Sequence, residues 1–151
     1  MAPITTTTIK YMKTTTAAFI IGFKGGLVAA TTRPAGGIGL PGGKLEAGET
    51  PAQAALREAQ EEGFIFPLET AQELVFHERA IVAGKQVEFF ITATTPEITT
   101  KGFKEKGRIT PIFTTPEILR ATGMGNKCIP TQKQFEKFQE LLGQAQEALY
   151  A

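Results

Sequence analysis

A single helical segment, set between stretches of strand-like sequence, constrains the fold of this chain more than any other feature. It runs from Pro51 to Glu62 and follows a glycine- and proline-rich stretch. Thr50 is a good N-cap, Pro51 suits the first helical position, and Gln53 completes a capping box with Thr50. Gly63 ends the helix, because glycine takes the left-handed conformation without a Cβ penalty. The segment therefore predicts one central helix with a defined start and end.

The sequence on both sides of this helix favours strands. Upstream, Thr15–Lys24 and Leu27–Thr32 flank a Gly-Gly turn signal and predict a β-hairpin, and Arg33–Gly43 is a loop with room for a short strand. Downstream, strands are expected at Ala71–Arg79, Gln86–Ala93 and Ile109–Phe113, and helices at Pro116–Ala121 and Gln132–Tyr150. This order predicts an α+β domain in which helices pack on a mixed sheet.

Length, charge and cysteine content limit the class of protein. A chain of 151 residues with 42% hydrophobic content predicts one domain over residues 1–151, with 1–14 as a flexible or edge-strand lead-in. The net charge of +1 argues against binding to a nucleic-acid polymer. Cys128 is the only cysteine, so an internal disulfide and a cysteine zinc site are excluded and a cytoplasmic location is expected. The longest apolar run, Ala17–Phe23, is far shorter than the roughly 18 residues of a membrane span.

Three carboxylates gather on the polar side of the central helix. Glu58, Glu61 and Glu62 stand at i, i+3 and i+4, where like charges repel by a few tenths of a kcal/mol per pair. A solvated acidic face is the ordinary explanation of such a cluster. Here, however, the cluster follows a glycine-rich loop whose backbone can approach a ligand closely. Clustered oxygen ligands are also what magnesium requires when it bridges carboxylates to substrate phosphates.

The segment GGKLEAGETPAQAALREAQEEGF resembles the Nudix box, written G-x5-E-x7-R-E-U-x-E-E-x-G-U with U a bulky aliphatic residue. The residues that match in register are Gly43, Glu49, Arg57, Glu58, Glu61 and Glu62, and Ile65 fills the last apolar position. On the basis of these residues, the chain is identified as a member of the Nudix (MutT-like) hydrolase family. The resemblance implies an α/β/α sandwich, with a mixed sheet and helices on both faces. It also implies metal-dependent cleavage of a nucleoside diphosphate linked to another moiety.

The resemblance assigns roles to individual residues. It implies a metal held by the carboxylates of Glu58, Glu61 and Glu62 and by the carbonyl of Gly42 or Gly43, with Mg²⁺ as the expected ion and Mn²⁺ as the second choice. Glu58 is also the candidate base that activates water. Arg57 and Glu49 resemble the ion pair that braces the loop against the helix.

Two positions depart from the family pattern. Ala59 replaces a larger aliphatic residue, which is a mild change. The glycine expected after the helix stands one residue early, at Gly63, and Phe64 occupies its place. The helix is therefore expected to end directly after Glu62, which bears on how Glu61 and Glu62 are aimed.

Residues outside the box are candidates for substrate binding. Arg33 could reach a phosphate, and a solvated loop arginine is the competing interpretation. Glu105, in KEKGR, could supply the late carboxylate that many family members add from a loop, with Glu88 as its competitor. Asn126 could read a purine base, or serve as an ordinary loop or capping residue. Ala80–Ala83 offers neither the proline nor the tyrosine expected of sugar-nucleotide or dinucleotide specialists, which favours a nucleoside triphosphate.

The expected reaction is conversion of a (deoxy)nucleoside triphosphate to its monophosphate and pyrophosphate. Hydrolysis of ADP-ribose or a dinucleotide is the alternative within the class. A non-catalytic module that senses a nucleotide is a second alternative, motivated by Gly63-Phe64. An isoprenoid-diphosphate isomerase, which would need Cys128 as catalyst, ranks last. The expected partner is a small-molecule nucleotide, with no nucleic-acid polymer and no membrane, and a homodimer is the candidate assembly.

Overall fold

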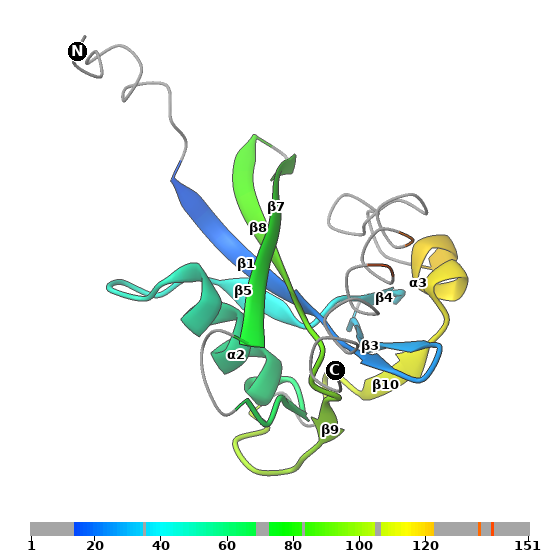
Figure 1. Ribbon diagram of the computed structural model, residues 1–151. Coiled ribbons are helices and arrows are strands. Elements are labelled where there is room, and N and C mark those ends of the chain that lie inside the picture. Colours follow the sequence, from blue (N-terminus) through cyan, green and yellow to red (C-terminus); the bar gives the residue numbers. More distant parts are fainter. Residues whose placement is uncertain are drawn as a thin grey trace, which may run out of the picture.

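The computed structural model describes residues 14–34, 36–68, 73–82, 84–104 and 107–122, together with positions 136 and 140. Figure 1 labels most of the elements in these ranges. The strands are β1 (Thr15–Ile21), β2 (Phe23–Lys24), β3 (Leu27–Thr32), β4 (Ile38–Gly39), β5 (Gly42–Lys44), β6 (Phe64–Ile65), β7 (Leu74–Val82), β8 (Lys85–Thr92), β9 (Glu97–Ile98) and β10 (Pro111–Thr114). The helices are α2 (Pro51–Glu61) and α3 (Pro116–Thr122). The helix predicted over Gln132–Tyr150 lies outside the described ranges.

The larger sheet is mixed, as the sequence predicts. Its strand order is β5-β1-β8-β7, in which β1 runs parallel to β8 and antiparallel to β5. β7 and β8 form an antiparallel hairpin at one edge. A second sheet has the order β10-β3-β2, and β4 also pairs with β3. Figure 1 shows β1 and β8 crossing the molecule between α2 and the second sheet.

The hairpin predicted for Thr15–Lys24 and Leu27–Thr32 is wrong for most of its length. Only β2 pairs with β3, at Phe23 and Lys24, whereas β1 belongs to the other sheet. The chain changes sheets at Gly22, where an added Cβ would lie 2.5 Å from a ring carbon of Phe66. Long-range pairing with β8 and β5 therefore outweighs the local turn signal. β6 and β9, which pair with each other, are two further strands that the sequence does not predict.

The core lies on both faces of β1. Ile20 belongs to a buried cluster that includes Ala55 and Ala59 of α2, and Ile21 belongs to a second cluster that includes Leu119 of α3. Because neighbouring residues of a strand point to opposite faces, α2 and α3 pack on opposite sides of β1. The small alanines let α2 lie close to β1 and β5, and this contact places the carboxylates of the helix beside the glycine loop.

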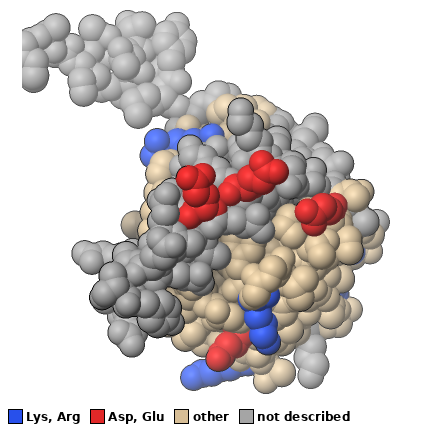
Figure 2. Space-filling view, turned by 45° about the vertical axis from the view of Figure 1, so that its right-hand side comes forward, with Lys and Arg blue, Asp and Glu red and all other residues tan. Residues whose placement is uncertain are grey.

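The second helix also begins where the sequence predicts. The Thr115 hydroxyl accepts a hydrogen bond from the Ile118 N–H at 3.2 Å, and Pro116 occupies the first turn. No helix in the described part of the chain is long and apolar enough to cross a membrane. On the face shown in Figure 2, the described acidic and basic side chains form small separate groups among uncharged residues.

Candidate active site

The capping box that the sequence predicts fixes the start of α2. The Gln53 N–H donates to the Thr50 hydroxyl at 3.2 Å, and the Thr50 N–H donates to Oε1 of Gln53 at 2.9 Å. This reciprocal pair satisfies two of the backbone donors that an α-helix leaves unpaired at its start. The helix axis is therefore anchored at the end where the glycine-rich loop arrives.

The other end of α2 accommodates the early glycine. Gly63 has φ 100°, and an added Cβ would lie 2.8 Å from Cγ of Pro111, so another residue would be both strained and crowded here. Phe64 is fully buried and meets Phe113 edge to face, with ring centroids 5.5 Å apart. The Thr99 N–H donates to the Gly63 carbonyl at 2.8 Å. The shifted glycine thus ends the helix at Glu61 with a packed, hydrogen-bonded anchor.

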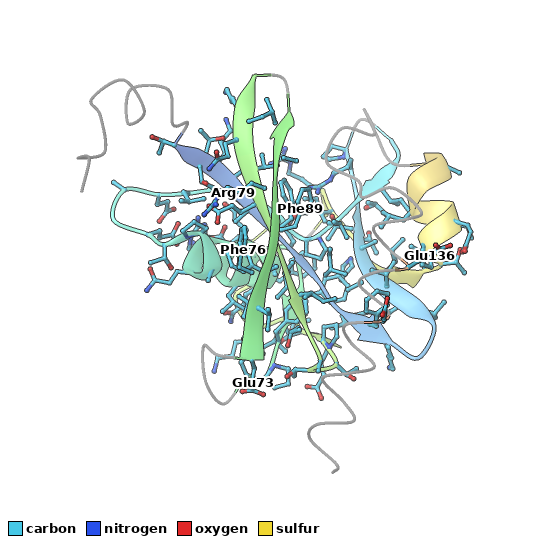
Figure 3. The ribbon with its side chains drawn as sticks, turned by 45° about the horizontal axis from the view of Figure 1, so that its top comes forward. Glu73, Phe76, Arg79, Phe89 and Glu136 are labelled. Atoms are coloured by element: carbon cyan, nitrogen blue, oxygen red, sulfur yellow. The ribbon has the colours of Figure 1, made fainter. Side chains whose placement is uncertain are left out.

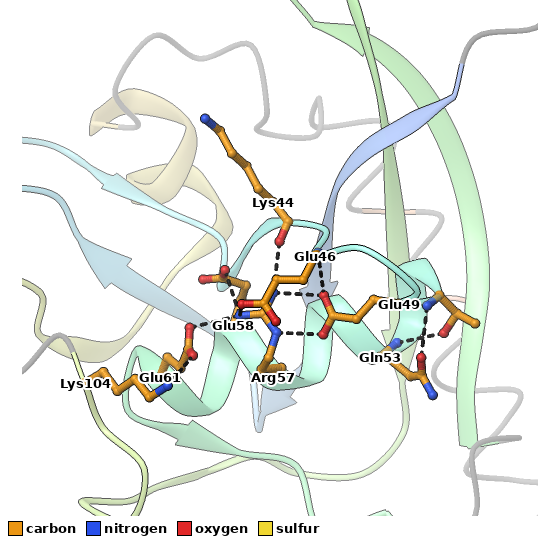
Figure 4. Close-up of polar contacts among 9 residues, drawn as sticks. Lys44, Glu46, Glu49, Gln53, Arg57, Glu58, Glu61 and Lys104 are labelled. Carbon is orange, nitrogen blue, oxygen red and sulfur yellow. Dashed lines mark hydrogen bonds and ion pairs between the residues drawn. The ribbon is translucent and has the colours of Figure 1, made fainter.

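Arg57 connects the carboxylates of the box (Figure 4). Its Nε and Nη2 donate to the two oxygens of Glu49 at 2.6 and 3.0 Å, and Nη2 also donates to the Lys44 carbonyl at 3.0 Å. Its Nη1 donates to Glu58 at 3.0 Å and to Glu61 at 3.1 Å. The predicted Arg57–Glu49 ion pair is therefore present. The same guanidinium additionally holds one oxygen each of Glu58 and Glu61.

The charges in this network reinforce one another. The hydrogen bonds from Arg57, together with one from the Glu46 N–H, lower the pKa of the Glu49 carboxyl below its usual value. The hydrogen bond to Glu49 in turn raises the pKa of Arg57, against the opposing effect of partial burial. Both groups stay charged at neutral pH, so the brace between loop and helix is a permanent ion pair.

Glu58 lies directly over the glycine loop. An added Cβ at Gly43 would lie 2.7 Å from Cδ and 2.8 Å from Oε2 of Glu58. Glycine is thus the residue that leaves room for this carboxylate. One oxygen of Glu58 bonds Arg57, and the other stands against the loop.

Glu62 is the buried member of the set. Its residue exposure is 2%, its Oε1 accepts from the Gly42 N–H at 2.8 Å, and its Oε2 accepts from Nη1 of Arg33 at 3.0 Å. Burial raises the pKa of Glu62 to about 7, even though the Gly42 N–H and the Arg33 charge lower it; the nearby Glu58 raises it further. Only glycine fits at position 42, because at φ 145° an added Cβ would collide with the carbonyl of Ala18.

The raised pKa of Glu62 makes the stability of the metal-free protein depend on pH. Between the ordinary value of 4.5 and about 7, the folded protein holds a proton that the unfolded chain has lost. Stability therefore falls as pH rises through this window and levels off above it, by about 3 kcal/mol at most. Denaturant unfolding in EDTA from pH 4.5 to 8 measures this slope. Glu62→Gln should remove the Glu62 contribution, and an unchanged slope in that variant would contradict the assignment.

The structure brings five of the predicted residues together and leaves others apart or undescribed. Arg57 directly contacts Glu49, Glu58 and Glu61. The loop of residues 42–43 completes the group, because Glu58 lies against Gly43 and Glu62 accepts from the Gly42 N–H. Arg33 contacts Glu62 and the Leu40 carbonyl; its contact with a substrate phosphate stays a prediction. Glu88 is buried on β8, with Arg79 of β7 at 3.8 Å. Glu105, Asn126 and Cys128 lie outside the described residues.

Sequence reasoning missed Lys104. Its Nζ lies 3.1 Å from Oε1 of Glu61, and the loop that carries it is tied to the end of α2. Nε2 of Gln60 donates to the Lys101 carbonyl at 3.2 Å, in addition to the Thr99–Gly63 bond described above. The alternating charges of KEKGR could have pointed to this lysine, but the sequence analysis selects Glu105 from that segment.

The donor set suits a hard divalent cation. The carboxylates of Glu58 and Glu62 lie against Gly43 and Gly42, and oxygen is the ligand atom that Mg²⁺ and Mn²⁺ prefer. The buried Glu62 has lost most of its water and would gain from a cation. Among the described residues, no three His, Cys, Asp or Glu side chains stand ready-made around a single point, and arginines hold these carboxylates instead.

Comparison with known proteins identifies the class. The family model described as the NUDIX domain matches residues 12–117, so the chain belongs to the Nudix domain family. It is accordingly a Nudix hydrolase, an enzyme that acts on phosphorus-containing acid anhydrides, and such enzymes generally use divalent metal ions. A comparison with curated protein sequences finds no match.

Solved structures share the fold at low sequence identity. The solution structure of the E. coli ORF135 protein is 21% identical, with a TM-score of 0.56 over 86% of this chain and 94% of that one. A MutT structure from work on Aliivibrio salmonicida and Vibrio cholerae is 18% identical, with a TM-score of 0.55 over 85% and 97%. A UDP-X diphosphatase is 21% identical, with a TM-score of 0.57 over 91% and 65%. At these identities the likeness shows the fold.

Proposed function

We propose that this Nudix hydrolase cleaves a (deoxy)nucleoside triphosphate to the nucleoside monophosphate and pyrophosphate, with Mg²⁺ as its cofactor and Mn²⁺ as a substitute. The proposal rests on the position of Glu58. Its carboxylate lies against Gly43, and Nη1 of Arg57 donates a hydrogen bond to one of its oxygens. A base in a fixed position beside a close-approach loop is what water-activated attack on a phosphate requires.

Each side chain of the site has a separate role in the proposed reaction. Glu58 accepts the proton of the attacking water, the new oxygen–phosphorus bond forms, and the bridging oxygen–phosphorus bond breaks with departure of pyrophosphate. Glu61, Glu62 and the carbonyl of Gly42 or Gly43 would hold the metal together with Glu58. The metal, when bound, supplies charge neutralisation at the phosphates. Arg57 keeps Glu58 and Glu61 oriented throughout.

The cations near the site favour a substrate with several phosphates. Lys104 is 73% exposed at its side chain and sits on Glu61, so it could exchange this contact for a phosphate oxygen at little cost. The segment Ala80–Ala83 carries neither of the residues expected of sugar-nucleotide or dinucleotide specialists. Both points support a nucleoside triphosphate over ADP-ribose or a dinucleotide.

A substrate panel tests the proposal. Nucleoside and deoxynucleoside triphosphates, oxidised purine triphosphates, ADP-ribose, a UDP-sugar and dinucleotides are incubated with Mg²⁺, with Mn²⁺ and with EDTA, and products are separated by chromatography. The expected result is monophosphate and pyrophosphate from one or more triphosphates, with activity lost in EDTA. Preferred cleavage of ADP-ribose, the UDP-sugar or a dinucleotide would replace the proposed substrate. Binding without any product would point to a nucleotide sensor instead.

A further inference from the structure

Two backbone hydrogen bonds fix the main chain at Arg33. This residue follows β3 directly, and its N–H donates to the Gly37 carbonyl at 3.0 Å. Its own carbonyl accepts from the Gly36 N–H at 2.9 Å. The arginine thus sits in a closed turn rather than in an open loop, and its side chain starts from a fixed point.

Both terminal nitrogens of the Arg33 guanidinium donate hydrogen bonds. Nη1 donates to Oε2 of Glu62 at 3.0 Å, and Nη2 donates to the Leu40 carbonyl at 2.9 Å. An added Cβ at Gly39 would lie 2.9 Å from both Nε and Nη2, so the guanidinium rests against this glycine. The Arg33 side chain is 24% exposed, whereas the Glu62 side chain is 3% exposed.

Glu62 consequently has a separate partner for each oxygen. The Gly42 N–H holds one, and Arg33 holds the other, so the rotation of the carboxylate is fixed against the glycine loop. Removing one partner of such a buried pair leaves a charge without compensation, which is strongly destabilising for the local arrangement. A lysine in place of Arg33 could not donate in the same two directions, because its ammonium is a point charge.

We infer that Arg33 is a positioning residue for hydrolysis, which acts by fixing the Glu62 carboxylate against the Gly42–Gly43 loop and not by binding a substrate phosphate. The inference rests on hydrolysis at the α2 carboxylates and holds whichever nucleotide is cleaved. Residues that orient a ligand of a metal typically contribute 10- to 100-fold to metal affinity or activity. Gly39 shares the role, since its missing side chain leaves the space in which the guanidinium lies.

A double-mutant cycle tests this inference. Arg33→Gln, Glu62→Gln and the double variant are compared for kcat and KM with the best substrate of the panel, and for Mn²⁺ affinity by calorimetry without nucleotide. Arg33→Gln should lower kcat, Mn²⁺ affinity or both by about 10- to 100-fold, with KM for the nucleotide nearly unchanged. In the Glu62→Gln background, the same change should have less than about a twofold further effect.

Two variants sharpen the cycle. Gly39→Ala keeps the Arg33 charge but displaces the guanidinium, so it should reproduce part of the Arg33→Gln loss. Arg79, next to Phe76 in Figure 3, is unsuitable as a control, because it faces the buried Glu88, the competing candidate for the late carboxylate. Lys24→Gln is the control, because Lys24 is an exposed cation of β2 that lies over the ring of Phe113. Its kcat and Mn²⁺ affinity should equal those of the wild type.

A rise in KM with unchanged kcat would overturn the inference, since it would make Arg33 a ligand of the substrate. An equally large loss in the Glu62→Gln background would also overturn it, because Arg33 would then act independently. If the wild type cleaves no nucleotide, the proposed function fails while the Mn²⁺ cycle still decides the role of Arg33. Absence of Mn²⁺ binding to the wild type would overturn both.

Discussion

Glu58→Gln is expected to lower kcat by about 10²- to 10⁴-fold while the protein stays folded. Glutamine keeps the size of the side chain and can still contact Arg57, but it carries no charge and does not accept the proton of the attacking water. Initial rates with the best nucleotide give the change in kcat, and a thermal melt checks the fold. Near-native turnover in this variant would remove Glu58 from the mechanism.

Gly43→Ala is the companion variant, because it leaves every charge in place. The new Cβ would lie 2.7 Å from Cδ of Glu58 and would push the carboxylate away from the loop. A displacement of about 1 Å at a reacting group can cost about 10²-fold in rate. Gly26→Ala serves as its control, since an added Cβ there meets no atom within 4 Å, and it should keep full activity.

Arg57→Gln is expected to have the largest effect on stability. It removes both bonds to Glu49 and the bonds to Glu58, Glu61 and the Lys44 carbonyl, leaving three carboxylates near one another without their common cation. Because hydrogen bonds to charged groups contribute about 1.5–3 kcal/mol each and these groups are partly exposed, we expect a loss of about 3 kcal/mol. For a chain of this size, the melting temperature should fall by roughly 10 °C.

Two glutamates near Arg57 provide the matched comparison. Glu49 is bound through both oxygens, whereas Glu46 is 3.7 Å from Arg57 and its side chain is 68% exposed. Glu49→Gln should therefore destabilise the protein, and Glu46→Gln should change the free energy of unfolding by less than about 0.5 kcal/mol. Equal effects of the two changes would show that the bidentate brace has no special part in stability.

The features that could be predicted from the sequence are those whose causes are local. The α2 start depends on Thr50, Pro51 and Gln53, which are neighbours along the chain, and the structure shows the capping box they form. The same holds for the Thr115 cap of α3. The hairpin prediction failed because the partner of β1 is β8, whose residues lie about seventy positions away, as in the pair Ala17–Val87.

In the site, too, a contact between residues near in sequence could be predicted and contacts between distant residues could not. The box fixes the spacing of Glu49 and Arg57, so their ion pair was accessible to prediction. The bonds from Arg57 to Glu58 and Glu61 were not predicted and came from the structure. The Arg33–Glu62 pair joins residues 29 positions apart and depends on how β3 meets the end of α2. The early Gly63 also needed the structure, because only the contact with Pro111 shows how the helix end is anchored.

Hydrolysis in ¹⁸O-labelled water, with the wild type and Glu58→Gln compared on the best substrate of the panel, tests whether water attacks phosphorus at the α2 carboxylates. The wild type should place one labelled oxygen on a phosphorus atom of one product for each diphosphate cleaved. Glu58→Gln should form this labelled product at least about 10²-fold more slowly. Product without the label, or labelled product at the same rate from both proteins, would contradict hydrolysis at the α2 carboxylates.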